Sequence, residues 1–171
     1  MRYKSAFIFC VCILFTLAGC ATAVSNAGTD SSDSMLIIGA SLHRMDPDGH
    51  VYQENYLLDS LSVKNLDTAH VYNIGLTYNH AVSTLPQGIY CVNTISPYSN
   101  ITLDYCGKPF FKLDPGKVVN AGYFVFAIDY PHHRYKLTKA FSDPQGLYGS
   151  LTKMEQESIN RFIGNHKHTS K

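Results

Sequence analysis

Short strand-like runs separated by turn residues are the feature that most limits how this chain can fold. Each run is rich in β-branched and aromatic residues or alternates apolar with polar positions, as half-buried strands do. The runs cover residues 35–44, 50–58, 61–66, 70–78, 89–95, 101–106, 110–113, 118–130 and 134–141. Many short strands of this kind are typical of two packed sheets or of a barrel. We therefore predict a mostly β fold, an antiparallel β-sandwich or open barrel.

The segments between the runs supply the chemistry that turns need. Asp-Pro-Asp-Gly at 46–49 is the strongest signal, because proline fixes φ early in the turn and glycine accepts a positive φ. Other turn residues cluster at 86–88, 97–100, 114–116 and 143–146. We expect segment 46–49 to join the first two strands in a hairpin.

One amphipathic helix is expected near the C-terminus. Thr152 and Glu155 have the spacing of a capping box, in which each side chain satisfies a backbone N–H of the other residue. An apolar stripe at helical spacing follows, formed by Met154, Ile159, Phe162 and Ile163. Gly164 suits a helix end. We expect the helix to pack across one sheet or close an open end, with residues 166–171 as a disordered tail.

The N-terminal segment predicts export. Residues 1–4 carry two positive charges, and residues 6–17 are apolar apart from Thr16. This run is too short to span a bilayer, which takes roughly 20 apolar residues. Leu-Ala-Gly-Cys at 17–20 follows it and resembles the lipobox of bacterial membrane lipoproteins. The resemblance implies a signal peptide at 1–19 and lipidation of Cys20; ordinary secretion after the Ala-Thr-Ala at 21–23 is the alternative.

A lipidated Cys20 would place the protein in the cell envelope, because two or more acyl chains hold a protein stably on a membrane. Ala21 follows the cysteine instead of the aspartate that resembles an inner-membrane retention signal, which favours the outer membrane, and we expect the protein on its periplasmic face. Residues 20–34 are then the acylated cysteine and a small, polar, flexible tether, and residues 35–165 are the β-sandwich domain. Loss of the first 19 of 171 residues leaves 152, enough for one domain with a core.

Charge limits the possible partners, and cysteine content agrees with export. Without Arg2 and Lys4, 12 basic residues face 13 acidic ones, so no basic surface is expected to bind nucleic acid. Cys10 and Cys12 lie in the leader, and Cys20 is assigned to the lipid. Cys91 and Cys106 remain, and two leftover cysteines in an oxidising compartment predict a disulfide.

A four-residue loop at 97–100 would set the register of the strands that carry these cysteines. It places Thr94 opposite Leu103 and Cys91 directly opposite Cys106, within the span of a disulfide. Alternation then assigns one set of side chains to the core: Tyr90, Val92, Thr94, Ile101, Leu103 and Tyr105.

Two further segments carry recognisable turn motifs. Leu-Pro-Gln-Gly-Ile-Tyr at 85–90 enters one strand, and Pro-Gly-Lys-Val at 115–118, followed by Gly122 and Tyr123, enters a later one. This pattern, over about a quarter of the chain, resembles small β-sandwich domains of uncharacterised envelope lipoproteins. The resemblance implies the fold and carries no activity.

No catalytic, cofactor or metal site is assigned. Ser41 lies in an incomplete G-x-S-x-G pattern inside a strand, whereas a nucleophile elbow needs a strand, a sharp turn and a helix. Asp46 and Asp48 are explained by the turn and lack the calcium-loop pattern. Adjacent His132 and His133 point to opposite faces of an extended chain. The remaining histidines fall in the tail (His166, His168) or are expected on strand surfaces (His43, His50, His70, His80).

Four tyrosines at even spacing within two strands offer either a binding face or core packing, and we favour the core; they are Tyr52, Tyr56, Tyr72 and Tyr78. We expect a non-enzymatic protein, anchored at Cys20, with a binding or structural role beside an envelope protein partner. A cell-wall-directed inhibitor or hydrolase is the alternative.

Overall fold

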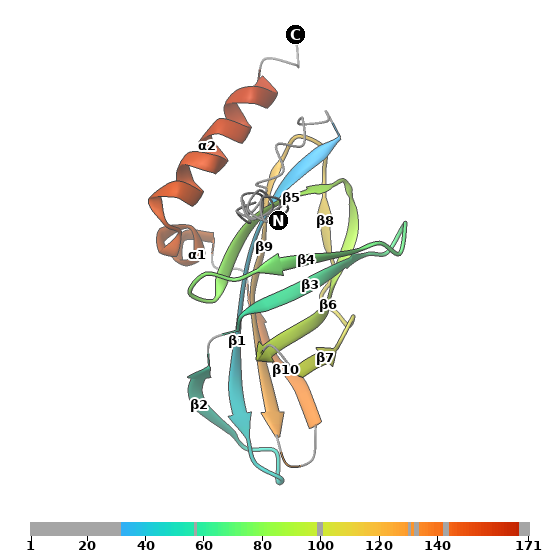
Figure 1. Cartoon of the computed structure of the whole chain (residues 1–171), viewed down its shortest axis with the longest axis vertical. Coiled ribbons are helices and arrows are strands. Elements are labelled where there is room, and N and C mark those ends of the chain that lie inside the picture. Colours follow the sequence, from blue (N-terminus) through green and yellow to red (C-terminus); the bar gives the residue numbers. More distant parts are fainter. Residues whose placement is uncertain are drawn as a thin grey trace, which may run out of the picture.

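The computed structural model describes residues 32–56, 58–98, 101–129, 131, 134–141 and 144–167. Two five-stranded sheets pack face to face, and two helices lie against one of them (Figure 1). The predicted mostly β sandwich with a C-terminal helix is confirmed. The first sheet contains β1 (Asp33–Met45), β2 (Val51–Tyr56), β5 (His80–Pro86), β9 (Val118–Asp129) and β10 (Arg134–Phe141). The second contains β3 (Ser60–Asn65), β4 (Val71–Gly75), β6 (Gly88–Tyr98), β7 (Ile101–Asp104) and β8 (Phe111–Leu113).

Strand β1 is the centre of the first sheet and is buried on both faces. It pairs antiparallel with β5 and then with β2 on one side. On the other side it pairs in parallel with β9, so the expectation of a wholly antiparallel sandwich is wrong for this pair. Leu36, Ile38 and Leu42 face the core between the sheets, whereas Met35 and Ile37 face the helices. Burial on both faces explains why the strand is almost continuously apolar instead of alternating.

The two helices, α1 (Pro144–Ser150) and α2 (Lys153–Lys167), form a second, smaller core on the outer face of the first sheet. Leu147, Leu151, Ile159 and Phe162 bury their side chains there. The capping box is confirmed: the Thr152 amide donates to Glu155 Oε2 at 2.8 Å, and the Glu155 amide donates to Thr152 Oγ1 at 3.3 Å.

Several predicted details of this region are wrong. Met154 is 80% exposed and does not belong to the buried stripe. The helix continues through Gly164 to Lys167, so residues 166 and 167 are helical and not part of a tail; residues 168–171 lie outside the described part of the chain. Helix α1 occupies a segment whose Asp-Pro-Gln-Gly predicts a turn, but proline is also favoured in the first turn of a helix.

Strand β5 lies in a segment where the sequence predicts no strand, and β1 begins earlier than expected. Residues 80–86 have few large apolar side chains and run into the Pro-Gln-Gly turn signal at 86–88. Each of them nevertheless pairs with a residue of β1. Asp33 and Ser34, assigned to the tether, are the first residues of β1. The Asp33 carbonyl accepts the Gly116 amide at 2.7 Å, a contact between segments far apart in the sequence.

The predicted disulfide is present, with the Cα atoms of Cys91 and Cys106 5.1 Å apart. The predicted register is wrong by one residue, because Thr94 pairs with Asp104 and not with Leu103. Strand β6 extends to Tyr98, which pairs with Ile101, so the connection is shorter than the expected four-residue loop. Cys106 therefore lies beyond β7 at a positive φ, with its amide bonded to the Val92 carbonyl.

A separate irregularity, in the pairing of β3 with β6, changes one core position. The pairing of β3 with β6 shifts between Ser62 and Val63, so Ile95, and not Thr94, joins Tyr90 and Val92 in the core. Thr94 instead places its hydroxyl 2.7 Å from that of Ser62. Leu103 and Tyr105 contact the core as predicted; the Ile101 side chain lies outside the described residues.

Candidate functional site at the β1–β2 hairpin

The β1–β2 turn lies at the opposite end of the sandwich from the start of β1 (Figure 1). Strand β1 has 13 residues, so it spans about 40 Å at a rise of about 3.3 Å per residue. The predicted hairpin is confirmed: Met45 pairs with Val51, and the Gly49 amide donates to the Asp46 carbonyl at 3.0 Å. Gly49 has the positive φ that the turn requires.

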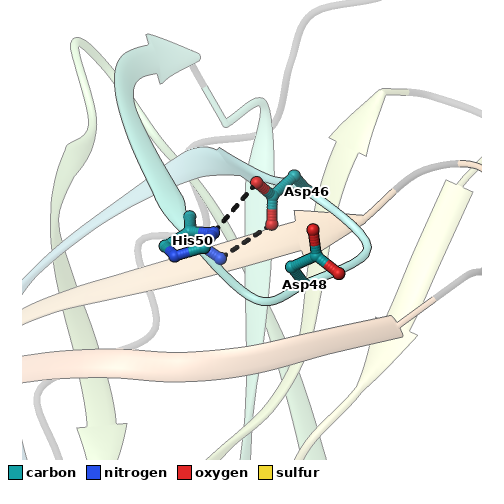
Figure 2. A group of neighbouring side chains, drawn as sticks. All are labelled: Asp46, Asp48 and His50. Atoms are coloured by element: carbon teal, nitrogen blue, oxygen red, sulfur yellow. Dashed lines mark hydrogen bonds and ion pairs between the residues drawn. The ribbon is translucent and has the colours of Figure 1, made fainter.

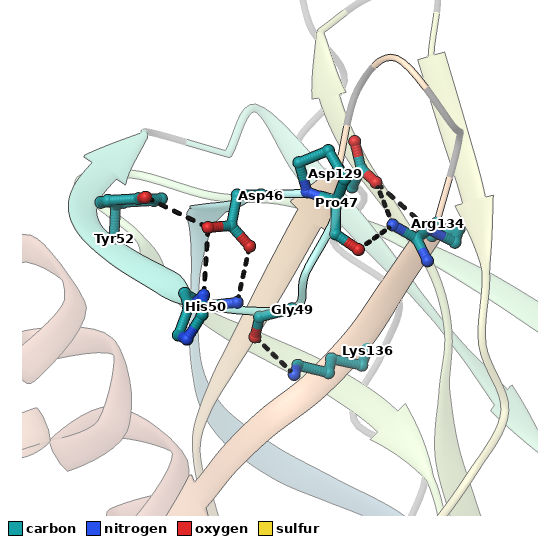
Figure 3. A network of polar contacts seen from close by, with 8 residues as sticks. All are labelled: Asp46, Pro47, Gly49, His50, Tyr52, Asp129, Arg134 and Lys136. Atoms are coloured by element: carbon teal, nitrogen blue, oxygen red, sulfur yellow. Dashed lines mark hydrogen bonds and ion pairs between the residues drawn. The ribbon is translucent and has the colours of Figure 1, made fainter.

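Asp46 organises the turn through its carboxylate. Its Oδ1 accepts the His50 amide at 2.8 Å, and its Oδ2 lies 3.1 Å from the Tyr52 hydroxyl and 3.2 Å from His50 Nδ1 (Figure 2, Figure 3). Desolvation raises the pKa of Asp46, but the hydrogen bonds from His50 and Tyr52 together outweigh it, so the pKa lies below its ordinary value. The same carboxylate raises the pKa of Tyr52.

The neighbouring β9–β10 hairpin holds the turn from the side. Arg134 donates to the fully buried Asp129 carboxylate at 2.6 Å and to the Pro47 carbonyl at 2.7 Å (Figure 3). Lys136 donates to the Gly49 carbonyl at 3.1 Å. These contacts join residues 87 positions apart in the sequence, and they fix the turn relative to the rest of the first sheet.

Asp46, Asp48 and His50 also have the donor atoms of a cation site. One ligand atom from each lies within 4.8 Å of the others (Figure 2). Carboxylate oxygen and imidazole nitrogen are ligands of zinc and of related divalent ions. However, Asp46 is already bonded to His50 and Tyr52, and Arg134 and Lys136 bring positive charge to the turn. The described contacts account for the three residues as a turn network, with an open carboxylate at Asp48.

No protein-family model, no curated protein and no solved structure matches this chain. None of the helices in the described residues is both long enough and apolar enough to cross a membrane. The functional proposal is therefore based on the sequence and the geometry of the chain itself.

The other residues considered from the sequence lie apart from this turn. Ser41 is buried inside β1, as expected of a strand residue, and pairs with Val125. His80 is not on a strand surface but buried, bonded to Glu155. Cys20, His132, His133 and His168 lie outside the described residues.

The preference for tyrosines in the core holds only for Tyr72, which packs against the core between the sheets. Tyr52 is 50% exposed beside the β1–β2 turn, and Tyr78 is 79% exposed in the turn before β5. The Tyr56 side chain lies outside the described residues. Sequence spacing could not separate these cases, because Tyr78 follows β4 in a turn and does not share a strand face with Tyr72.

Proposed function

We propose that this protein is a lipid-anchored component of a bacterial cell envelope, with a non-enzymatic binding or structural role beside another envelope protein. The anchor is inferred from the lipobox resemblance at 17–20, with Cys20 as the acylated residue. Ala21 after the cysteine, in place of the aspartate of an inner-membrane retention signal, supports the outer membrane.

The direction of β1 is the observation that carries the proposal. A chain anchored at Cys20 enters the domain at Asp33, where β1 begins, and β1 leads to the turn at 46–49 at the other end. An anchored domain can thus present this turn on the side away from its point of attachment. Asp48, Val51 and Tyr52 expose their side chains there, and aromatic residues are enriched in protein interfaces.

The anchor can be tested by the intact mass of the protein purified from its native envelope. Acylation at Cys20 requires a chain that begins at Cys20 and carries the mass of its acyl groups. An unmodified chain beginning at Val24 would show ordinary secretion instead. Cys20→Ser should leave the precursor uncleaved or release the protein from the membrane fraction.

The binding role can be tested by crosslinking in intact cells from a photoreactive residue placed at the turn. We expect residue 48 to yield a discrete crosslinked protein, because its side chain is exposed and forms none of the bonds that hold the turn. A photoreactive residue at exposed position 161, on α2, is the matched control. Recovery of only the uncrosslinked protein, under conditions that capture a known envelope complex, would contradict the proposal.

A further inference from the structure

Strand β4 forms one edge of the second sheet and, among the described strands, pairs only with β3 (Figure 1). The bonds just beyond the two ends of this ladder fix which groups face inward. At one end the Asn65 amide donates to the His70 carbonyl at 2.9 Å, and at the other the Leu76 amide donates to the Asp59 carbonyl at 2.9 Å. Hydrogen-bonded positions alternate along an antiparallel ladder, so every second residue of β4 from Val71 on directs its N–H and C=O away from β3.

The outward positions are Val71, Asn73 and Gly75. All three residues are exposed, and no group in the described part of the chain bonds to their amides or carbonyls. The side chains of Tyr72 and Ile74 between them contact the core of the sandwich. Unpaired main-chain groups at every second residue of an edge strand can bind another extended strand.

The other edge strands each have a feature that hinders such pairing. The register shifts in the ladders of β2 and β10, and β10 also carries the charged residues Arg134 and Lys136. Strands β7 and β8 have only four and three residues. The outward groups of β5 are used at both ends, because His80 bonds to Thr77 through its amide and carbonyl, and Pro86 has no N–H. Strand β4 has five residues without a charge, a proline or a register shift.

We infer that β4 is a self-association edge, at which two copies of this chain pair their β4 strands antiparallel about a two-fold axis through Asn73. In this register Asn73 lies opposite Asn73 of the second copy, and Val71 lies opposite Gly75 of the second copy. All the outward main-chain groups of both strands then bond to each other, as a two-fold contact requires. The second sheets of the two copies become one continuous sheet.

The side chains fit this register. Val71, Asn73 and Gly75 lie on the outer face of the sheet, because the residues between them face the core. Nothing lies within 4 Å of a Cβ added at Gly75, so there is room beside it for Val71 of the second copy. The two Asn73 amides can donate to and accept from each other. An uncharged strand also brings no like charges together when it meets its own copy.

This fit between identical strands favours a second copy over an unrelated strand as the occupant of the edge. The inference depends neither on the lipid anchor nor on a partner at the β1–β2 turn, which lies in the other sheet.

Cysteines at the outward positions test the register in intact cells. Asn73→Cys should give a covalent dimer on mild oxidation, because hydrogen-bonded opposite residues have Cα atoms about 5.5 Å apart, within the span of a disulfide. Val71→Cys alone should give none, but should crosslink to coexpressed Gly75→Cys. The unmodified protein, which keeps its own cysteines, gives the background, and peptide mapping locates each new bond.

Two results would overturn the inference. One is the absence of a dimer from Asn73→Cys in protein whose Cys91–Cys106 bond is intact. The other is a bond from Asn73→Cys to a different protein in place of the second copy, since the edge would then serve that protein.

A charge at the two-fold axis tests whether the pairing is more than a chance collision. Asn73→Lys, introduced into both the Val71→Cys and the Gly75→Cys chains, should lower the yield of their crosslink about fivefold, because it sets like charges directly opposite each other. Asn160→Lys, at an exposed position of α2, is the matched control and should leave the yield unchanged. Hydrogen-exchange protection of β3 reports whether each variant is folded. Equal yields from the two lysine variants would overturn the inference.

Discussion

Single residues in this protein act through contacts that their neighbours in sequence do not reveal. A methyl group at Gly39 would overlap the Tyr123 ring and come within 3.2 Å of Leu147. Asp46 gathers three donors from residues four and six positions later in the chain. In both cases the groups that the folded chain places beside a residue limit the size or charge of the side chain at that position.

Gly39→Ala should destabilise the protein. The Tyr123 ring lies in the small core between the first sheet and the helices, so it must shift, and overpacking of this kind costs about 1–3 kcal/mol. Gly75→Ala is the matched control, since nothing lies within 4 Å of an added Cβ in that strand. Chemical denaturation measures both variants. Equal stability of the two would show that the Tyr123 ring moves without cost.

Asp46→Asn should loosen the β1–β2 turn, whereas Asp48→Asn should not. The pKa of Asp46 is lowered in the folded state, so its stabilisation is present above the unfolded pKa and is lost as the pH falls through the folded pKa. The melting temperature of Asp46→Asn should therefore lie below that of the unmodified protein at neutral pH and approach it in acid. A pH-independent difference would mean that the charge is irrelevant to the turn.

At the level of elements, packing against the first sheet decides the position of α2 more than the helix pattern does. The predicted stripe contained four residues, of which Ile159 and Phe162 are buried, while Met154 and Ile163 are exposed. The helices meet the sheet over three strands, because Met35 and Ile37 of β1 share this core with Val82 of β5 and with Val118 and Tyr123 of β9. An amphipathic pattern predicts a buried face but not its width.

Phe162→Ala should cost about 3–5 kcal/mol of unfolding free energy, because it removes a buried aromatic side chain from the core between the first sheet and the helices. Met154→Ala, at an exposed position of the same helix, should change it little. Thr152→Ala should cost about 1 kcal/mol through loss of the cap. Equal melting temperatures for the Phe162 and Met154 variants would contradict the position of α2.

The disulfide ties β6 to the segment after β7. Its cysteines are 15 positions apart. Because the bond lowers the chain entropy of the unfolded state, it should stabilise the folded state by about 3 kcal/mol. A double Cys91→Ala and Cys106→Ala variant should lose about this much stability. The reduced, unmodified protein should lose a similar amount in the same denaturation experiment. A double variant as stable as the oxidised protein would show that the bond is dispensable.

Across the whole molecule, β1 connects two cores that lie on opposite sides of the first sheet. Ile38 is buried between the sheets, and Ile37 is buried beneath the helices. The larger core contains residues from both sheets, while the smaller one depends on α1 and α2 alone to cover the sheet. The two cores can therefore differ in how readily they open.

Ile37→Ala and Ile38→Ala should each cost about 2–5 kcal/mol. Their hydrogen-exchange patterns should differ: Ile37→Ala should deprotect α2 while β3 and β6 stay protected, whereas Ile38→Ala should lower protection across both sheets. Identical patterns for the two variants would indicate that the helices and the sandwich open as one unit.

Local signals in the chain were enough to predict most of the strands, the Asp-Pro-Asp-Gly hairpin, the capping box of α2 and the pairing of the two cysteines. Each of these depends on residues close together in sequence or, for the cysteines, on Cys91 and Cys106 being the two that remain once the predicted leader and lipidation site are set aside. Strand β5 and helix α1 lacked such a signal, since one is poor in large apolar residues and the other begins in a turn-like Asp-Pro-Gln-Gly.

The folded arrangement alone decided the register of β6 and β7, the burial of His80 and the network at the hairpin tip. A shift of one residue at 62–63 moved Ile95 into the core in place of Thr94. His80 meets Glu155 across 75 residues, and Arg134 meets Pro47 across 87. Contacts at such separations form only when the strands and α2 pack together, so short-range periodicity in the sequence cannot predict them.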